Sequence, residues 1–80
     1  MTDPTVLVRY IAEHLVEKPE AVEVGEGEGR RSRVVHLAVA PDDMGRVIGR
    51  DGRVANAVRT LLAAGRFGER WGLEVRDDDD

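Results

Sequence analysis

The sequence contains no cysteine, which excludes disulfide bonds, thiolate metal sites and cysteine nucleophiles. It has one Trp, one Tyr and one Phe, too few aromatic rings for a platform on which nucleic-acid bases stack in succession. No apolar run approaches the ~20 residues of a membrane-spanning helix, and no signal-peptide core follows Met1. We therefore expect a cytoplasmic protein with no membrane partner.

Length and composition fit one small globular domain. The chain has 80 residues, of which 41% are hydrophobic and 35% charged, as in an ordinary globular protein and not a disordered one. A domain of this size buries only about 60% of its unfolded-chain surface, so association with a partner would supply missing burial. We predict a single domain over residues 1–76 and an acidic tail without fixed structure over residues 77–80.

Charge is distributed unevenly along the chain. The formal net charge is −4, and the four aspartates at 77–80 account for all of it. Residues 1–29 carry seven acidic side chains and two basic ones, whereas residues 44–70 carry six arginines and two acidic residues. A polyanion responds to the local field more than to the net charge, so residues 44–70 are the candidate surface for one.

Hydrophobic periodicity predicts a first helix over residues 4–17. The Thr-Asp-Pro sequence at 2–4 supplies capping side chains and a proline suited to the first turn, and Pro19 ends the helix. The expected apolar stripe comprises Val6, Leu7, Tyr10, Ile11, His14 and Leu15. We expect Tyr10 and Trp71 to lie in the core.

Three further segments have the apolar alternation of strands, at 21–25, 33–39 and 71–76. In the third, Trp71, Leu73 and Val75 share one face, as in a strand with one covered side. The glycine-rich stretch 25–32 separates the first two segments and predicts a loose hairpin loop.

Two more helices are expected between the second and third strands. The first is short, ends near Ile48 and is capped by Asp42 or Asp43, and the second covers residues 53–65 with Gly65 as its C-terminal cap. A helical crossover makes the two strands parallel. The sequence thus predicts an α+β fold of order α-β-β-α-α-β, a three-stranded mixed sheet with three helices on one face.

The stretch Val-Ile-Gly-Arg-Asp-Gly-Arg at 47–53 places two glycines three apart, directly before the longer helix. Glycine supplies the positive φ that a turn between helices needs, so a purely structural turn is one interpretation. Without Cβ atoms this backbone can also lie against another backbone, at the helix end whose dipole favours phosphate. Arg50 and Arg53 add charge within reach of phosphate oxygens. Asp51 opposes phosphate binding, unless its carboxylate points away or bonds a backbone N–H.

This motif resembles the Ile-Gly-x-x-Gly signature of KH RNA-binding domains, and the element order resembles their type II (bacterial) arrangement. The stretches 5–16, 18–22 and 40–62 together are similar to the small stand-alone bacterial KH proteins of the KhpA (YlqC) family. The resemblance covers residues 4–76, nearly the whole chain.

The resemblance implies a non-catalytic protein that grips the sugar-phosphate backbone of about four unpaired nucleotides. The implied RNA-binding residues are Arg46, Val47, Ile48, Gly49, Arg50, Asp51, Gly52 and Arg53. Gly49 to Gly52 form the clamp, Val47 and Ile48 floor an apolar groove for bases, and Arg46 and Arg53 flank it. Few aromatic rings predict low sequence specificity. The family further implies an RNA chaperone that acts with a KhpB-like partner, or as a homodimer, in cell-envelope homeostasis, cell shape and division.

No residue pattern indicates catalysis, a cofactor, a metal or a small-molecule substrate. His14 and His36 have no cysteine or carboxylate at ligand spacing, and Ser32 lacks a histidine and an acid in a recognisable order. An alternative from another class stays open: a KH-fold protein-interaction module with little RNA affinity. Asp51, the net acidity and the scarcity of aromatic residues favour that alternative.

Overall fold

The computed structural model describes residues 3–64, 67 and 69–77. The helices and strands are α1 (Pro4–Leu15), β1 (Glu23–Glu28), β2 (Arg33–Val39), α2 (Met44–Ile48), α3 (Arg53–Ala63) and β3 (Trp71–Asp77). Three single-turn 3-10 helices lie between them: η1 (Pro19–Ala21), η2 (Pro41–Asp43) and η3 (Arg50–Gly52). The predicted α+β class and the order α-β-β-α-α-β are confirmed.

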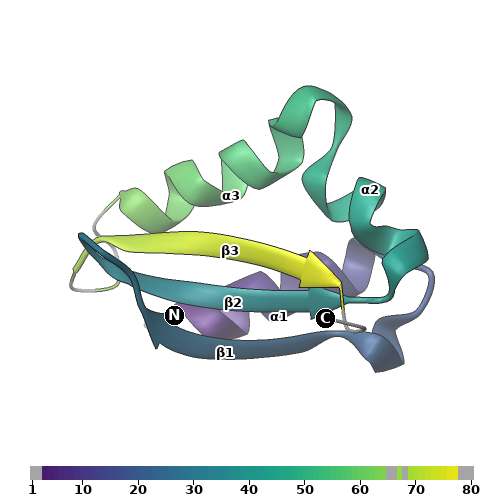
Figure 1. Cartoon of the computed structure of the whole chain (residues 1–80), viewed down its shortest axis with the longest axis horizontal. Coiled ribbons are helices and arrows are strands. Elements are labelled where there is room, and N and C mark those ends of the chain that lie inside the picture. The colour runs from purple at the N-terminus through teal and green to yellow at the C-terminus, as the bar shows by residue number, and fades with distance from the viewer. Residues whose placement is uncertain (1–2, 65–66, 68, 78–80) are drawn as a thin grey trace.

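The sheet has the order β1-β2-β3. β1 and β2 pair antiparallel as a hairpin, and β2 and β3 pair parallel, with Val35 opposite Leu73. The parallel pairing follows from the α2–α3 crossover between those strands, as the sequence predicted. In Figure 1 the strands lie in front of α1, and α2 and α3 lie on the β3 side of the sheet.

One face of the sheet and the three helices enclose a single apolar core. The buried residues of that core are Val8, Ala12, Val22, Val35, Leu37, Val39, Val47, Ala55, Val58, Leu62, Trp71 and Leu73. Alternation along β2 turns Val35, Leu37 and Val39 into the core, while Val34 and His36 lie on the other, partly exposed face. Residues 33–39 thus form a strand with the apolar alternation found in the sequence.

α1 buries a different stripe from the expected one. Pro4, Val8 and Ala12 are its buried residues, at a spacing of four, whereas Val6 is 50% and Tyr10 59% exposed. Small side chains at i, i+4 and i+8 allow the helix axis to lie close to the sheet, which larger residues on the same face would prevent. The prediction that Tyr10 lies in the core is wrong.

The predicted start of the first helix is confirmed, and its predicted end is not. The Asp3 carboxylate accepts a hydrogen bond from the Thr5 N–H at 2.9 Å and caps the N-terminus of α1. The helix ends at Leu15, two residues before the expected limit, because Val16 is already extended (φ −92°, ψ 159°). Trp71 is buried, as expected.

β1 extends into the glycine-rich stretch that was expected to be a loop. The Glu26 carboxylate accepts a hydrogen bond from Arg33 at 2.8 Å across the hairpin. His36 lies over Gly27, where a Cβ atom would be 2.0 Å from the His36 Nε2. Pairing with β2 therefore outweighs the low strand propensity of glycine, and the loop is reduced to residues 29–32, closed by the Gly29 N–H on the Ser32 carbonyl at 2.8 Å.

The C-terminal part of the chain also differs from expectation. β3 continues through Asp77, so this strand includes the first residue of the predicted acidic tail. Residues 78–80 of that tail and the predicted Gly65 cap lie outside the described residues, and α3 ends at Ala63. Within the described part of the chain, no helix has the length and apolar character needed to cross a membrane.

Candidate nucleic-acid interface

The turn between α2 and α3 has unusual backbone geometry at three of its four residues. Positive φ angles occur at Gly49 (+79°), Asp51 (+57°) and Gly52 (+79°). A Cβ atom at Gly49 would lie 2.5 Å from Val54 Cγ2 and 2.8 Å from the Val54 nitrogen, so only glycine fits there. At Gly52 the nearest atom to such a Cβ is Asn56 Nδ2 at 3.6 Å, and the positive φ alone restricts that position.

Hydrogen bonds fix the conformation of this turn. The Gly49 N–H donates to the Gly45 carbonyl at 2.9 Å, and the Gly52 N–H donates to the Gly49 carbonyl at 3.1 Å. Gly52 is the N-cap of α3, and no side chain caps the first turn of that helix. The helix dipole therefore presents its positive end at an exposed turn, where an anion is stabilised.

The side chains at the tip carry two positive charges and one negative charge. Arg50, Asp51 and Arg53 are all exposed. Within the described part of the chain no hydrogen bond or ion pair engages any of these three side chains. The two guanidinium groups are thus available to a phosphate. The Asp51 carboxylate does not bond a described backbone N–H, which removes one of the two alternatives left by the sequence.

The three predicted residues before the turn, Arg46, Val47 and Ile48, differ in their surroundings from the exposed side chains at its tip. Val47 is buried in the core, and Ile48 is half-buried beside it. An apolar hollow between α1 and α3 is lined by Val8, Ile11, Ala12, Leu15, Leu37, Val47, Val54, Val58 and Leu73. Val47 thus lines a small hollow of about 10 Å³ in the core beside α1, which is too small to receive a base. Arg46 is engaged in ion pairs with Glu17 and Asp43.

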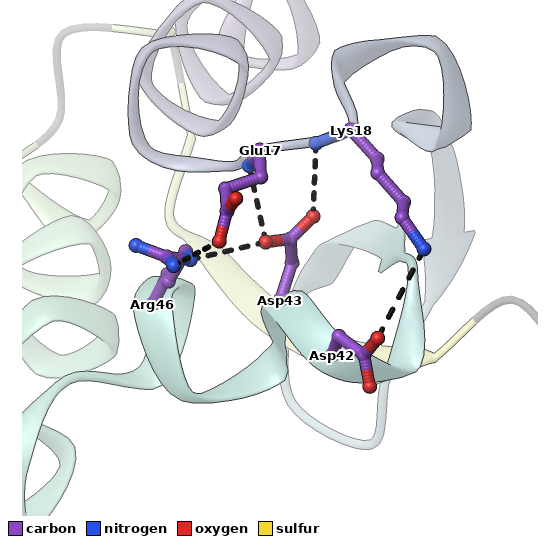
Figure 2. A network of polar contacts seen from close by, with 5 residues as sticks. All are labelled: Glu17, Lys18, Asp42, Asp43 and Arg46. Carbon is purple, nitrogen blue, oxygen red and sulfur yellow. Dashed lines mark hydrogen bonds and ion pairs between the residues drawn. The ribbon is translucent and has the colours of Figure 1, made fainter.

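Asp43 is the centre of a polar network that the sequence did not reveal (Figure 2). Its carboxylate oxygens accept hydrogen bonds from the Glu17 and Lys18 N–H groups, both at 3.1 Å. Asp43 occupies the N-cap position of α2, as predicted, but neither its side chain nor that of Asp42 makes a capping hydrogen bond at η2 or α2. The Glu17 N–H bond holds the pKa of Asp43 below its ordinary value, burial opposes this, and the Lys18 N–H and the Arg46 charge add to the lowering.

A shallow trough lies between the second half of α3 and the first residues of β3. Its lining residues are Ser32, Val34, Arg59, Thr60, Ala63, Arg70, Trp71, Gly72 and Leu73, none of them acidic. Asn56 connects turn and trough, since its amide lies beside Gly52 and its Oδ1 accepts a hydrogen bond from Arg59 at 3.0 Å. The sequence analysis missed Asn56 and Arg59. Their spacing of four and seven residues from Gly52, on one helical face, is the signal that could have found them.

Two helices joined by a Gly-x-x-Gly turn, inserted between parallel strands of a three-stranded sheet, define a KH domain with the type II element order. A family model described as the KH domain of KhpA/KhpB matches residues 5–75. The chain therefore belongs to the KhpA/KhpB KH-domain family.

Relatives in three bacteria agree with this assignment. The chain is 52% identical over 64 residues to the RNA-binding protein KhpA of Caldanaerobacter subterraneus, covering 80% of this chain and 85% of the relative. It is 49% identical over 63 residues to that of Clostridium perfringens (79% and 84%) and 42% identical over 73 residues to that of Treponema pallidum (89% and 91%). These names describe RNA-binding proteins and not enzymes. No solved structure gives a significant match.

The two glycines of the turn should differ in their tolerance of a side chain. Gly49→Ala is expected to lower the free energy of unfolding by about 3 kcal/mol or more, because its φ of +79° and ψ of 169° suit glycine alone and its Cβ would meet Val54. Gly52→Ala is expected to cost only about 1 kcal/mol, the penalty of a left-handed conformation. Urea unfolding of both variants measures the difference, and equal losses would contradict the steric argument.

Asp43 should make the stability of the fold depend on acid pH. Because its folded-state pKa is lowered, the ionised carboxylate contributes its full stabilisation well above the ordinary aspartate pKa of about 3.9, and this is lost as pH falls through the lower folded-state pKa. Asp43→Asn should therefore lower the Tm at pH 7, and the Tm difference from wild type should narrow below about pH 4. Thermal unfolding at pH 7, 5 and 3 measures this. Asp42→Asn, at an 89% exposed side chain, is the control and should change little; a gap for Asp43→Asn that stays constant with pH would refute the linkage.

Proposed function

We propose that this protein binds single-stranded RNA, and that the Gly49–Gly52 turn grips the RNA backbone. The observation that carries the proposal is the turn itself: a positive-φ backbone, without a capping side chain, at the N-terminus of α3. Membership in a family whose named relatives are RNA-binding proteins supports it. RNA is the polyanion that such a KH turn holds, through the backbone of a few unpaired nucleotides.

The parts of the turn have different tasks in this proposal. The missing Cβ atom of Gly49 lets the turn close against Val54, and that of Gly52 lets the sugar-phosphate chain approach. The α3 dipole favours the negative charge of that chain. Arg50 and Arg53 contact phosphate oxygens from either side of the tip. Asp51 lowers the affinity by repulsion, so binding is moderate. Ile48, half-buried beneath the turn, offers apolar surface to a base.

The RNA strand continues from the turn into the trough between α3 and β3. Asn56 and Arg59 lie one and two helical turns from Gly52, and Arg70 is at the far end. Trp71 is buried and Tyr10 lies on the outer face of α1, so neither of these rings stacks on a base. Contact through the backbone and through few base edges gives low sequence specificity, which is the property of an RNA chaperone.

A protein partner is the second part of the proposal, and an apolar surface favours it. Leu61 of α3 is 50% exposed and Tyr10 of α1 59% exposed, on the two helices that border the apolar hollow. Large apolar side chains left exposed on adjacent helices favour an interaction surface. We propose that a KhpB-like protein or a second copy of the chain docks there, in the cytoplasm, and that the complex acts in cell-envelope homeostasis, cell shape and division.

RNA binding is tested by titrating a labelled single-stranded RNA at low and at physiological salt. Gly52→Asp should reduce the affinity at least about tenfold, because it places a carboxylate in the phosphate path. It is a cleaner variant than Gly49→Asp, since nothing crowds a Cβ at Gly52. Asp51→Asn is the opposite control and should raise affinity, most at low salt.

The salt dependence supplies a further check on this prediction. The logarithm of the affinity should fall linearly with the logarithm of the salt concentration, as counterion release requires. Wild-type protein that binds no RNA at low salt, or a folded Gly52→Asp variant that binds as well as wild type, would refute the clamp and leave the protein-interaction module as the better interpretation.

The apolar surface is tested by Leu61→Asp. A charge in the docking surface should abolish self-association, or association with a KhpB-like protein, because it would have to be desolvated. The fold should tolerate the change, since this side chain is half exposed. Sedimentation velocity of each protein alone and mixed measures the complex. Thr60→Asp, an exposed neighbour on the trough side of α3, is the matched control; equal effects of both substitutions would place the partner elsewhere.

A further inference from the structure

Asp43 is the one buried charged residue in the described part of the chain, with 1% of its surface exposed. Its carboxylate receives the Glu17 and Lys18 N–H groups, which belong to the segment that leaves α1 and has no helical acceptor for them. Figure 2 shows this carboxylate pointing from the start of α2 into that segment. One side chain thus fastens α2 to the end of α1, across about 25 residues of sequence.

Arg46 closes the same network from the next turn of α2. Its Nε lies 3.2 Å from Asp43 Oδ1, and its Nη2 donates to the Glu17 carboxylate. Two of the three guanidinium nitrogens, Nε and Nη2, are therefore directed at acidic groups of the protein, on a side chain that is 48% exposed. Glu17, Asp42 and Asp43 outnumber Lys18 and Arg46, so this corner carries a net negative charge and would repel a phosphate.

The network fixes the position of α2, and α2 in turn fixes the position of the Gly49–Gly52 turn. The helix has only five residues, too few to be stable without tertiary contacts, and Gly49 follows it directly. Buried Val47 holds its middle, and the network holds its first turn. Substitution of Asp43 or Arg46 would let the first helical turn of α2 move. The backbone of the Gly49–Gly52 turn would then lose its fixed position.

We propose that Asp43 and Arg46 are positioning residues of the RNA clamp, and that Arg46 acts through the protein without touching RNA. This rests on the proposed RNA-binding function. It separates Arg46 from Arg50 and Arg53, which lie in the same arginine-rich segment but have no partner among the described residues. The sequence could not separate them, because Asp43 and Glu17 meet Arg46 only in the folded chain.

The first experiment compares Arg46→Gln with Arg53→Gln by titration of a labelled single-stranded oligonucleotide RNA over a series of salt concentrations. Each phosphate contact contributes about −0.7 to the slope of log affinity against log salt for a single strand. Arg53→Gln should flatten the slope by about that amount. Arg46→Gln should weaken binding about threefold to tenfold at every salt concentration, with the wild-type slope. A slope flattened as much as in Arg53→Gln would overturn the proposal and make Arg46 a contact residue.

A double-mutant cycle tests whether the two residues act as one unit. Asp43→Asn should weaken RNA binding to a similar extent as Arg46→Gln, and the double variant should be little weaker than either single one. Losses that multiply would show independent roles and overturn the coupling.

The second experiment needs no RNA. Amide hydrogen exchange of the free protein is followed at Gly49 and Gly52, whose N–H groups donate to the Gly45 and Gly49 carbonyls. Val35 in β2 is the reference for global opening. Asp43→Asn and Arg46→Gln should accelerate exchange at both glycines about tenfold relative to Val35. Unchanged relative exchange overturns the positioning role. Wild-type protein that binds no RNA refutes the proposed function instead, and the exchange result still decides the role of the network.

Discussion

The Glu17 and Lys18 N–H groups, which follow α1, have no helical acceptor and need hydrogen-bond partners elsewhere in the fold. The Asp43 carboxylate supplies both. Because the chain is short and its core thin, α1 and α2 share little apolar surface, and hydrogen bonds must fix what packing alone does not. Asp43 accepts both N–H groups and gains Arg46 as a counter-charge. Asp43 thereby links the three-residue connection after α1 to the start of α2 and to the approach to the glycine turn.

The turn shows how local strain is held by its surroundings. Gly49 adopts a conformation that suits glycine alone, and Val54 occupies the space where another residue would need a side chain. Asp51 adopts a left-handed conformation that aspartate tolerates better than most residues. The result is an exposed, well-defined backbone beside two guanidinium groups, which is a surface for a ligand with many similar charged groups and little need for shape matching.

Much of the fold could be predicted from the sequence because it depends on local patterns. Alternation over 33–39 and 71–76 gave the inner faces of two strands, and the helical crossover gave their parallel pairing. The face of α1 could not be predicted, since both Val6–Tyr10 and Val8–Ala12 are apolar at helical spacing and only the sheet selects between them. The extent of β1 depends on the His36 ring and on Arg33, contacts that glycine-rich composition does not reveal.

Some residues of the candidate site could likewise be predicted from the sequence, and others could not. Gly49 and Gly52 stand out because no other residue serves their role, and Arg50 and Arg53 because they adjoin them. Asp43 stands at the N-cap position of α2, where an aspartate usually bonds the first turn of its own helix, but the capping role predicted for its side chain is wrong. Its true partners lie about 25 residues earlier, at a distance that periodicity does not report.

The uncovered face of the sheet differs in charge from the side of the domain that carries the arginines. This face carries Glu23 and Glu74 beside His36 and Arg76, and the hollow there is bordered by Glu26 as well. The arginines of the turn and trough lie in η3, on α3 and directly before β3. The charge of the molecule is therefore asymmetric. Its electrostatic field orients the domain toward an approaching polyanion before any contact forms. A chain with a negative total charge can in this way direct its arginine-bearing side toward a polyanion while its acidic sheet face points away.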